Sequence, residues 1–171
     1  MEIRDLFSVI PAELADNSSV WIFQSSRPLG DKEVVEMNDQ LHHFYSQWKS
    51  HGDPVKGWAQ VFFNRYVVII ADENTIKLGG CSKDDSMRVI KSFERQYQIT
   101  LFDRLSITFL IKDKIEMLPL NQVQYAIDKG FISKDTLMFN NLVATKKEFV
   151  EKWLSPISET WLAGRVLLGV G

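Results

Sequence analysis

The residues best suited to chemistry lie between Asp72 and Arg88. The only cysteine, Cys81, follows a Gly-Gly pair and precedes the expected start of a helix. The dipole of a helix favours a thiolate near its N-terminus and so lowers a cysteine pKa. Asp84 and Asp85 follow at once, and their carboxylates would repel a second negative charge. Cysteine is also among the residues most often buried, so the sequence favours a Cys81 packed beneath a helix cap over a nucleophile.

Nucleotide binding is a second chemistry that this region suggests. In "VVIIADE" a run of apolar residues precedes Asp72 and Glu73, as in the strand that supplies magnesium-binding carboxylates to P-loop ATPases. The partner motif GxxxxGK[ST], whose backbone amides hold the phosphates, does not occur in the chain. "LGGCSK" has the wrong spacing, and Asp84 and Asp85 occupy the place of a phosphate. We therefore expect no P-loop ATPase activity.

Metal binding is the third chemistry. His42 and His43 are adjacent, so on a helix they point in different directions and cannot hold one ion as residues four apart can. The carboxylates around Asp72 and Asp84 could converge on a hard cation, but solvated loop charges explain them more simply. We expect no metal site and no cofactor.

Composition limits the class of protein. The chain has 171 residues, a net charge of −2, 45% hydrophobic and 25% charged residues, which is typical of a globular protein and gives no basic field for nucleic acid. One cysteine cannot form an internal disulfide, and no apolar run approaches the ~20 residues that span a bilayer. No linker or repeat divides the chain. We expect one domain over residues 1–171, a cytoplasmic location, no nucleic-acid partner and no membrane insertion.

The first half of the chain predicts two strand regions and two helices. "VWIFQS" (20–25) is β-branched and aromatic, which is typical of a strand. Asp31 is the expected cap of a long helix that ends before Gly52 and Pro54. Its apolar stripe recurs at spacings of three and four: Val34, Met37, Leu41, Phe44 or Tyr45, and Trp48. Residues 58–73 are too long for one strand, so we expect two strands joined near Asn64-Arg65.

The second helix follows the Gly-Gly-Cys turn, with Ser82 as its expected cap. Its expected buried face consists of Met87, Ile90, Phe93 and Tyr97.

The second half predicts a hairpin around Lys112-Asp113-Lys114 and a short helix between the cap Asn121 and the terminator Gly130. Residues 136–142 are expected to form the final strand. Thr145 and Glu148 have the spacing of a capping box at the start of the last helix. The whole pattern predicts an α+β fold, with a mixed or largely antiparallel sheet of about five to six strands covered by about four helices.

Four blocks of the sequence support a resemblance. "VWIFQSSR", "FNRYVVIIADE", "GCSKDDSMRVI" and "FNNLVATKKEFVEKW", followed by "SETW", occur in this order between Val20 and Trp161. The chain thereby resembles a family of small uncharacterised bacterial proteins often labelled "ABC transporter ATPase". The resemblance implies a cytoplasmic bacterial protein and no particular catalytic residues. The chain has neither the phosphate loop nor an LSGGQ-type signature that ATP hydrolysis by such proteins requires.

Two functions follow as hypotheses. The first is a non-enzymatic cytoplasmic binding or adaptor domain, with self-association or an unknown protein partner engaged by apolar segments such as "AGRVLLGVG" (163–171). The alternative is a small-molecule site or an enzyme at the loops around Asp72 and Cys81. Its candidate ligand-binding residues are Arg65, Asp72, Cys81 and Arg88.

Overall fold

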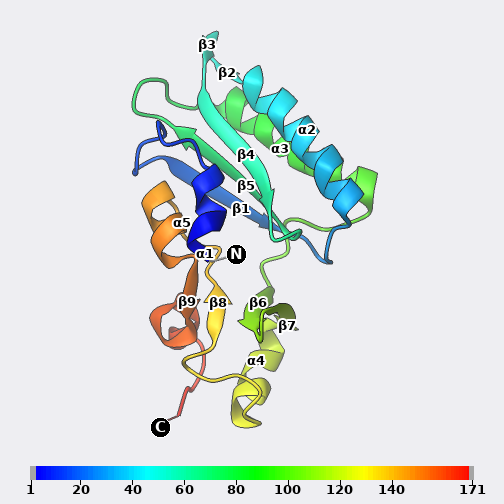
Figure 1. The fold of residues 1–171 in the computed structure, drawn as a ribbon, viewed down its shortest axis with the longest axis vertical. Helices are drawn as coiled ribbons and strands as arrows, with labels where there is room; N and C mark the ends of the chain where they lie inside the picture. The colour runs from blue at the N-terminus through cyan, green and yellow to red at the C-terminus, as the bar shows by residue number, and fades with distance from the viewer. Residues whose placement is uncertain (1–2, 170–171) are drawn as a thin grey trace. The chain divides into compact units, whose positions relative to one another are not determined.

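The computed structural model describes residues 3–169, whose strands and helices separate into two units (Figure 1). The first unit comprises Met1–Phe102 and Ala144–Val150, and the second comprises Asp103–Val143 and Glu151–Gly171. Each is described by itself, and the single domain expected from the sequence stays a prediction. The α+β class is confirmed, but the described residues form nine strands in three antiparallel sheets rather than five to six strands in one.

The first unit is built on a three-stranded sheet of order β1-β5-β4, in which both pairings are antiparallel. Its elements are α1 (Ile3–Leu6), η1 (Phe7–Val9), β1 (Ser19–Gln24), α2 (Asp31–Ser46), β2 (Lys49–Ser50), β3 (Asp53–Pro54), β4 (Lys56–Phe62), β5 (Tyr66–Asp72), α3 (Gly80–Tyr97) and α5 (Lys146–Lys152). The expected strand pair over residues 58–73 is therefore confirmed. Its turn contains Phe63 and Asn64, which both have positive φ.

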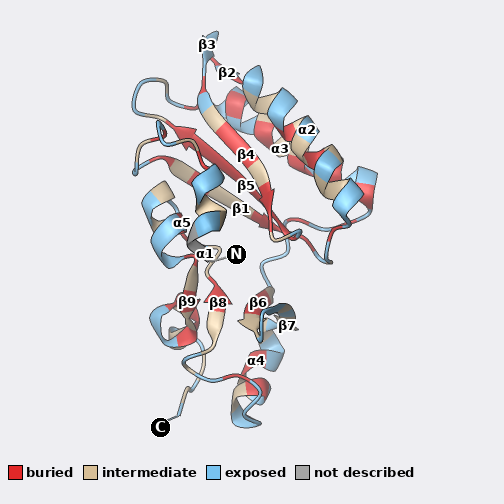
Figure 2. Cartoon of the chain, viewed as in Figure 1, coloured by how far each residue is buried: buried red, intermediate tan, exposed pale blue. Residues whose placement is uncertain are grey.

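The central strand β5 is buried along its whole length, because both faces of the sheet are covered (Figure 2). Alternate residues of a strand point to opposite faces. Val67, Ile69 and Ala71 belong to the core shared with α2 and α3, which lie side by side on one face (Figure 1). On the other face Phe62 packs edge-on against Phe149 of α5. This sheet is the support on which α2 and α3 are held.

The stretch after α2 differs from the expectation. Gly52 and Pro54 were expected to stop the helix, but α2 already ends at Ser46, and Lys49–Ser50 and Asp53–Pro54 form a small hairpin. His51 and Gly52 make its turn with φ of 52° and 84°. A two-residue turn with positive φ at both positions suits the right-handed twist of a hairpin.

The second unit contains a four-stranded antiparallel sheet of order β7-β6-β8-β9. Its elements are β6 (Ser106–Ile111), β7 (Lys114–Pro119), α4 (Leu120–Asp128), β8 (Leu137–Phe139), β9 (Leu154–Pro156), η2 (Ile157–Glu159) and η3 (Trp161–Gly164). The predicted hairpin is confirmed, with Lys112 and Asp113 in its turn at φ of 51° and 63°. The strand at 136–142 is shorter than expected and is not the last, since β9 pairs with it.

Several helix caps differ from the sequence predictions. The N-caps of α2 and α4 are Gly30 and Pro119 instead of Asp31 and Asn121, while Gly130 ends α4 with φ of 77° as expected. At α5 the amide of Glu148 donates to Oγ1 of Thr145, as a capping box requires.

The second hydrogen bond of the expected capping box at α5 is displaced by one residue. The Glu148 carboxylate accepts from the amide of Ala144 rather than of Thr145. In the C-terminal segment Val166 and Leu168 pack on the core of the second unit and Leu167 is exposed, whereas Val170 and Gly171 lie outside the described residues.

Within residues 3–169, no helix combines the length and the apolar character needed to cross a bilayer.

Candidate functional site

Arg65 and Asp72, two of the four candidate ligand-binding residues, lie at opposite ends of β5. Arg65 is in the turn before the strand and Asp72 is its last residue, so seven residues at about 3.3 Å each put them roughly 20 Å apart. Arg65 is 6% exposed, and its guanidinium donates to the carbonyl oxygens of Ser25 and Ser26. It therefore fastens the end of β1 to the turn.

Asp72 is occupied by structural hydrogen bonds. Its carboxylate accepts from the amide and the side chain of Asn74 at 3.0 and 2.7 Å and from the amide of Ala15 at 3.3 Å, with Lys56 at 3.7 Å. The backbone hydrogen bond from Asn74 is the main cause that lowers the pKa of this carboxyl. These contacts fix two loops to the end of the sheet, and they leave little of the carboxylate for a ligand.

The burial expected for Cys81 is wrong, because its side chain is exposed. The helix α3 begins at Gly80 with Gly79 as its N-cap, so Ser82 lies in the first turn instead of capping it. Ser82 takes the inward position, and its hydroxyl donates to the carbonyl of Gly79 at 2.8 Å. Cys81, one residue earlier, is turned about 100° around the helix and faces outward.

Arg88 is also exposed and pairs with Asp85 at 2.6 Å on the surface of α3. The structure therefore does not gather Arg65, Asp72, Cys81 and Arg88 into one pocket. His42 and His43 are exposed on α2, and the described residues contain no group of three or more His, Cys, Asp or Glu side chains that could hold a metal ion.

A different site lies between α2 and α3. A side-chain hydrogen bond joins the two helices near each end, and we call these two hydrogen bonds the ties. At one end the indole N–H of Trp48 donates to the carbonyl of Ser82 at 2.9 Å. At the other end the hydroxyl of Tyr97 donates to Oε2 of Glu36 at 2.9 Å. Burial, with the hydrogen bond to Glu36, raises the pKa of Tyr97 to about 12, so this hydroxyl keeps its proton at neutral pH.

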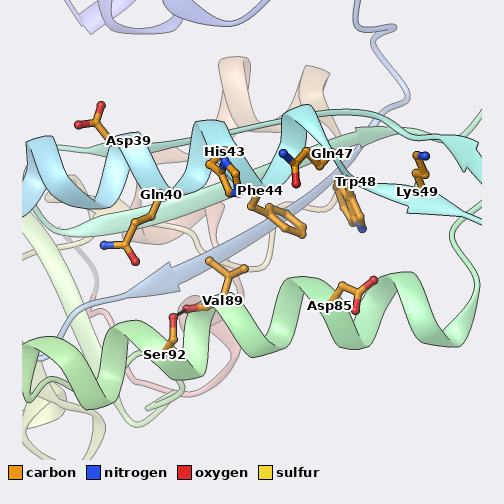
Figure 3. A pocket seen from close by; sticks show the side chains of 10 residues that line it. All are labelled: Asp39, Gln40, His43, Phe44, Gln47, Trp48, Lys49, Asp85, Val89 and Ser92. Atoms are coloured by element: carbon orange, nitrogen blue, oxygen red, sulfur yellow. Dashed lines mark hydrogen bonds between the residues drawn. The ribbon is translucent and has the colours of Figure 1, made fainter.

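Between the two ties the helices enclose an open groove of about 640 Å³ (Figure 3). Phe44 and Val89 point toward one another across it from α2 and α3. The groove is lined by Asp39, Gln40, His43, Phe44, Gln47, Trp48, Lys49, Asp85, Val89 and Ser92. Three of these residues are apolar, namely Phe44, Trp48 and Val89, and the other seven are polar or charged.

The side chains around the groove are held by packing against the core of the first unit. Trp48 is 3% exposed and packs on Phe44, with ring centroids 4.8 Å apart. A Cβ built on Gly57 would lie 2.6 Å from the Trp48 ring. The indole therefore packs over the sheet at this point because Gly57 has no side chain. Met37 and Leu41 are fully buried beneath α2. Among the partly buried members of the apolar stripe, Phe44 is the one that lines the groove.

Sequence reasoning missed the groove, because it assigned Phe44 to the core with the rest of the stripe. One signal in the sequence could have indicated the groove, because the neighbours of Phe44 on the helix surface are polar. They are Gln40 four residues before it, and His43 and Gln47 beside it. A core stripe is usually flanked by apolar residues at such positions.

No family model, curated protein or solved structure matches this chain.

Proposed function

We propose that this chain is a non-enzymatic binding domain and that its ligand site is the groove between α2 and α3. The observation that carries the proposal is the pair of ties at the two ends, Trp48 to Ser82 and Tyr97 to Glu36, with the groove between them. A site that is open before its ligand arrives loses little side-chain freedom on binding, which favours affinity.

The size and lining of the groove favour a small organic molecule. A volume of about 640 Å³ lies within the range of about 300–1,000 Å³ that is common for ligand pockets. Phe44 and Val89 supply apolar contacts, while Gln40, His43 and Gln47 supply hydrogen-bonding groups at the rim. This combination orients a ligand that is partly apolar and partly polar.

The state of the reactive groups favours binding over catalysis. Among the lining residues the only hydroxyl, that of Ser92, donates to the carbonyl of Val89 at 2.6 Å within its own helix. The carboxylate of Asp85 is held by Arg88 at 2.6 Å. A nucleophile needs an adjacent base that activates it, and Ser92 is instead bonded to a backbone carbonyl.

The proposed location is the cytoplasm. Cys81 is the only cysteine and its thiol is exposed, so an oxidising compartment would expose it to disulfide formation between molecules. A reducing compartment removes this hazard.

The proposal is tested with a thermal-shift screen of small metabolites and two matched variants. Val89→Trp fills the groove from α3, and Val35→Trp adds the same bulk at a position of α2 that is 61% exposed. A ligand of the folded state raises the melting temperature. We expect hits that stabilise the wild type and Val35→Trp but not Val89→Trp. Hits that persist in Val89→Trp would place the site elsewhere, and a screen without any hit would contradict a binding function.

A further inference from the structure

The side-chain amide of Gln40 has a fixed orientation at the Tyr97 end of the groove. Tyr97 has one hydroxyl proton, and it donates this proton to Oε2 of Glu36 at 2.9 Å. The Tyr97 oxygen can therefore only accept a further hydrogen bond, and Nε2 of Gln40 donates to it at 3.4 Å. A flipped amide would set its oxygen against the Tyr97 oxygen with no proton between them. The amide oxygen of Gln40 is thus left as an acceptor for a ligand.

Ser92 presents a second acceptor from the opposite helix. Its hydroxyl donates to the carbonyl of Val89 at 2.6 Å, so the proton is used while the lone pairs of Oγ remain. Within the described part of the chain, no donor is bonded to Oε1 of Gln40 or to Oγ of Ser92. In Figure 3 the Gln40 amide is directed toward α3, and the Ser92 side chain is directed toward α2. Both residues line the groove, so this end of it offers two hydrogen-bond acceptors.

The two carboxylates of the lining, Asp39 and Asp85, are not available to a cationic ligand. Asp39 points away from α3 (Figure 3), and Asp85 is paired with Arg88 at 2.6 Å. An ammonium that left water for the Tyr97 end would meet acceptors but no unpaired carboxylate of the lining. A charge that loses water without gaining a counter-charge is unfavourable, and an uncharged donor avoids this cost.

We infer that the ligand of the α2–α3 groove carries an uncharged NH2 group, as in a primary amide, which donates to Oε1 of Gln40 and Oγ of Ser92. Its apolar part lies against Phe44 and Val89. This inference rests on the proposed function and specifies the ligand class of the same site. One NH2 group has two protons and can serve both acceptors, whereas a hydroxyl has one. An ester or a carboxylate at this place would set lone pairs against lone pairs.

Three compounds with alkyl chains of similar length test the inference: hexanamide, 2-heptanone and hexylamine. 2-Heptanone has the shape of hexanamide with a methyl group in place of NH2, and hexylamine carries an ammonium at neutral pH. Compounds of this size bind with a Kd of about 1 mM, so binding is followed by two-dimensional NMR of the 15N-labelled protein. Hexanamide should shift the side-chain NH2 signals of Gln40, which Gln40→Leu identifies. It should bind about twofold to tenfold tighter than 2-heptanone, as a neutral hydrogen bond provides, and hexylamine should bind most weakly.

Two variants test the two acceptors. Gln40→Leu keeps apolar bulk without the amide, and Ser92→Ala removes the hydroxyl. Each should reduce the preference for hexanamide over 2-heptanone, while Gln96→Leu, at an exposed glutamine of α3 outside the groove, should leave it unchanged. Gln40→Leu also loses the hydrogen bond to Tyr97, whereas Ser92→Ala loses only one within its own helix. Ser92→Ala therefore keeps the test decisive if Gln40→Leu does not fold.

The outcomes distinguish this inference from the proposed function. Equal or tighter binding of 2-heptanone, or a preference for hexanamide that both variants retain, would overturn the NH2 class and leave a binding groove. Tightest binding of hexylamine would show a cationic ligand, which also overturns the inference. If none of the three binds while screening hits are lost in Val89→Trp, the ligand class is wrong and the function stands. If no compound of either set binds, both fail. Gln40 signals that shift with protein concentration alone would show that a second copy occupies the groove, and the inference would again be wrong.

Discussion

Trp48 donates its indole N–H to the main-chain carbonyl of Ser82 over 2.9 Å, which joins the chain just after α2 to the first turn of α3. Both groups are buried, so neither can exchange this bond for one to water. A lost hydrogen bond therefore leaves a buried carbonyl with one partner fewer, and this raises the free-energy cost above that of an exposed bond.

Two substitutions of Trp48 should lower the free energy of unfolding by different amounts. Trp48→Phe keeps a ring but loses the N–H, and it should cost about 1–2 kcal/mol of unfolding free energy. Trp48→Ala should cost about 3–5 kcal/mol, because it also leaves a cavity. Chemical denaturation measures both. Trp161→Phe is the control, since Trp161 is only partly buried; a cost equal to that of Trp48→Phe would argue against the buried bond.

Gly57 and Gly80 should respond to alanine in opposite ways. A Cβ on Gly57 would lie 2.6 Å from the ring of Trp48, whereas one on Gly80 would meet nothing within 4 Å. We expect Gly57→Ala to cost about 1–3 kcal/mol through overpacking. Gly80→Ala, at the start of α3, should be neutral or stabilise by up to about 1 kcal/mol. A tolerated Gly57→Ala, measured by thermal unfolding, would mean that the indole is free to move.

Glu33 should make stability depend on pH in the acidic range. Its carboxylate accepts two hydrogen bonds of 2.8 Å from Arg27, and these, with the bond from the Gly30 amide, lower the pKa of Glu33 from 4.5 to about 2. A lowered pKa gives stability that is complete above about pH 4.5 and is lost as the pH falls toward 2.

The measurement for Glu33 is a comparison of the wild type with Glu33→Gln. The variant should be about 1 kcal/mol less stable at pH 7, as expected for a partly exposed pair, and the difference should narrow between pH 4.5 and 2. A constant difference across this range would show that the ion pair contributes nothing.

Local turn chemistry explains which parts of the fold the sequence predicted. The break near Asn64 and the turn at Lys112-Asp113 separate strongly apolar strand segments, so both hairpins were correct. Strand β9 was missed because "LSP" has three residues and follows a helix without a periodic signal. The number of sheets could not be predicted, since it depends on which strands pair across long separations in the sequence.

The exposed position of Cys81, one of the four candidate residues, has a local reason at the start of α3. The start of α3 lies at Gly80, and a shift of the expected helix start by a few residues exchanges the inward and outward places of Ser82 and Cys81. The groove itself depends on the Trp48–Ser82 and Tyr97–Glu36 contacts, whose partners are 34 and 61 residues apart. No spacing rule within one helix could reveal them.

Cys81 should react with a thiol reagent in the folded protein almost as fast as in denaturant, because its side chain is exposed. Cys81→Ser should change the unfolding free energy by less than about 0.5 kcal/mol, as is usual for surface positions. Ser82→Ala beside it should cost about 1 kcal/mol, because it removes a buried hydroxyl that donates to Gly79. Slow labelling of the native protein would restore the buried position that the sequence suggested.

Magnesium ATP should not raise the melting temperature. A phosphate-binding loop leaves its backbone amides free to hold an anion, but here three amides between β5 and α3, those of Asn74, Leu78 and Gly79, already have protein acceptors. The Leu78 amide donates to Glu73 at 3.0 Å, and the Gly79 amide donates to the hydroxyl of Ser50 at 3.1 Å.

The architecture around that loop also differs from a phosphate-binding fold. The strand before it, β5, is paired antiparallel on both sides, whereas nucleotide-binding sites of doubly wound folds lie at the carboxyl ends of parallel strands. Differential scanning fluorimetry with up to about 5 mM nucleotide checks the expectation. A site with a Kd of about 50 μM would stabilise the fold by about 2.7 kcal/mol at that concentration, a shift of a few degrees or more. A dose-dependent rise with both ATP and magnesium tripolyphosphate would contradict the assignment of these amides to structural hydrogen bonds alone. A rise with ATP only would show that the nucleoside is recognised, and it would contradict the expectation that ATP does not bind.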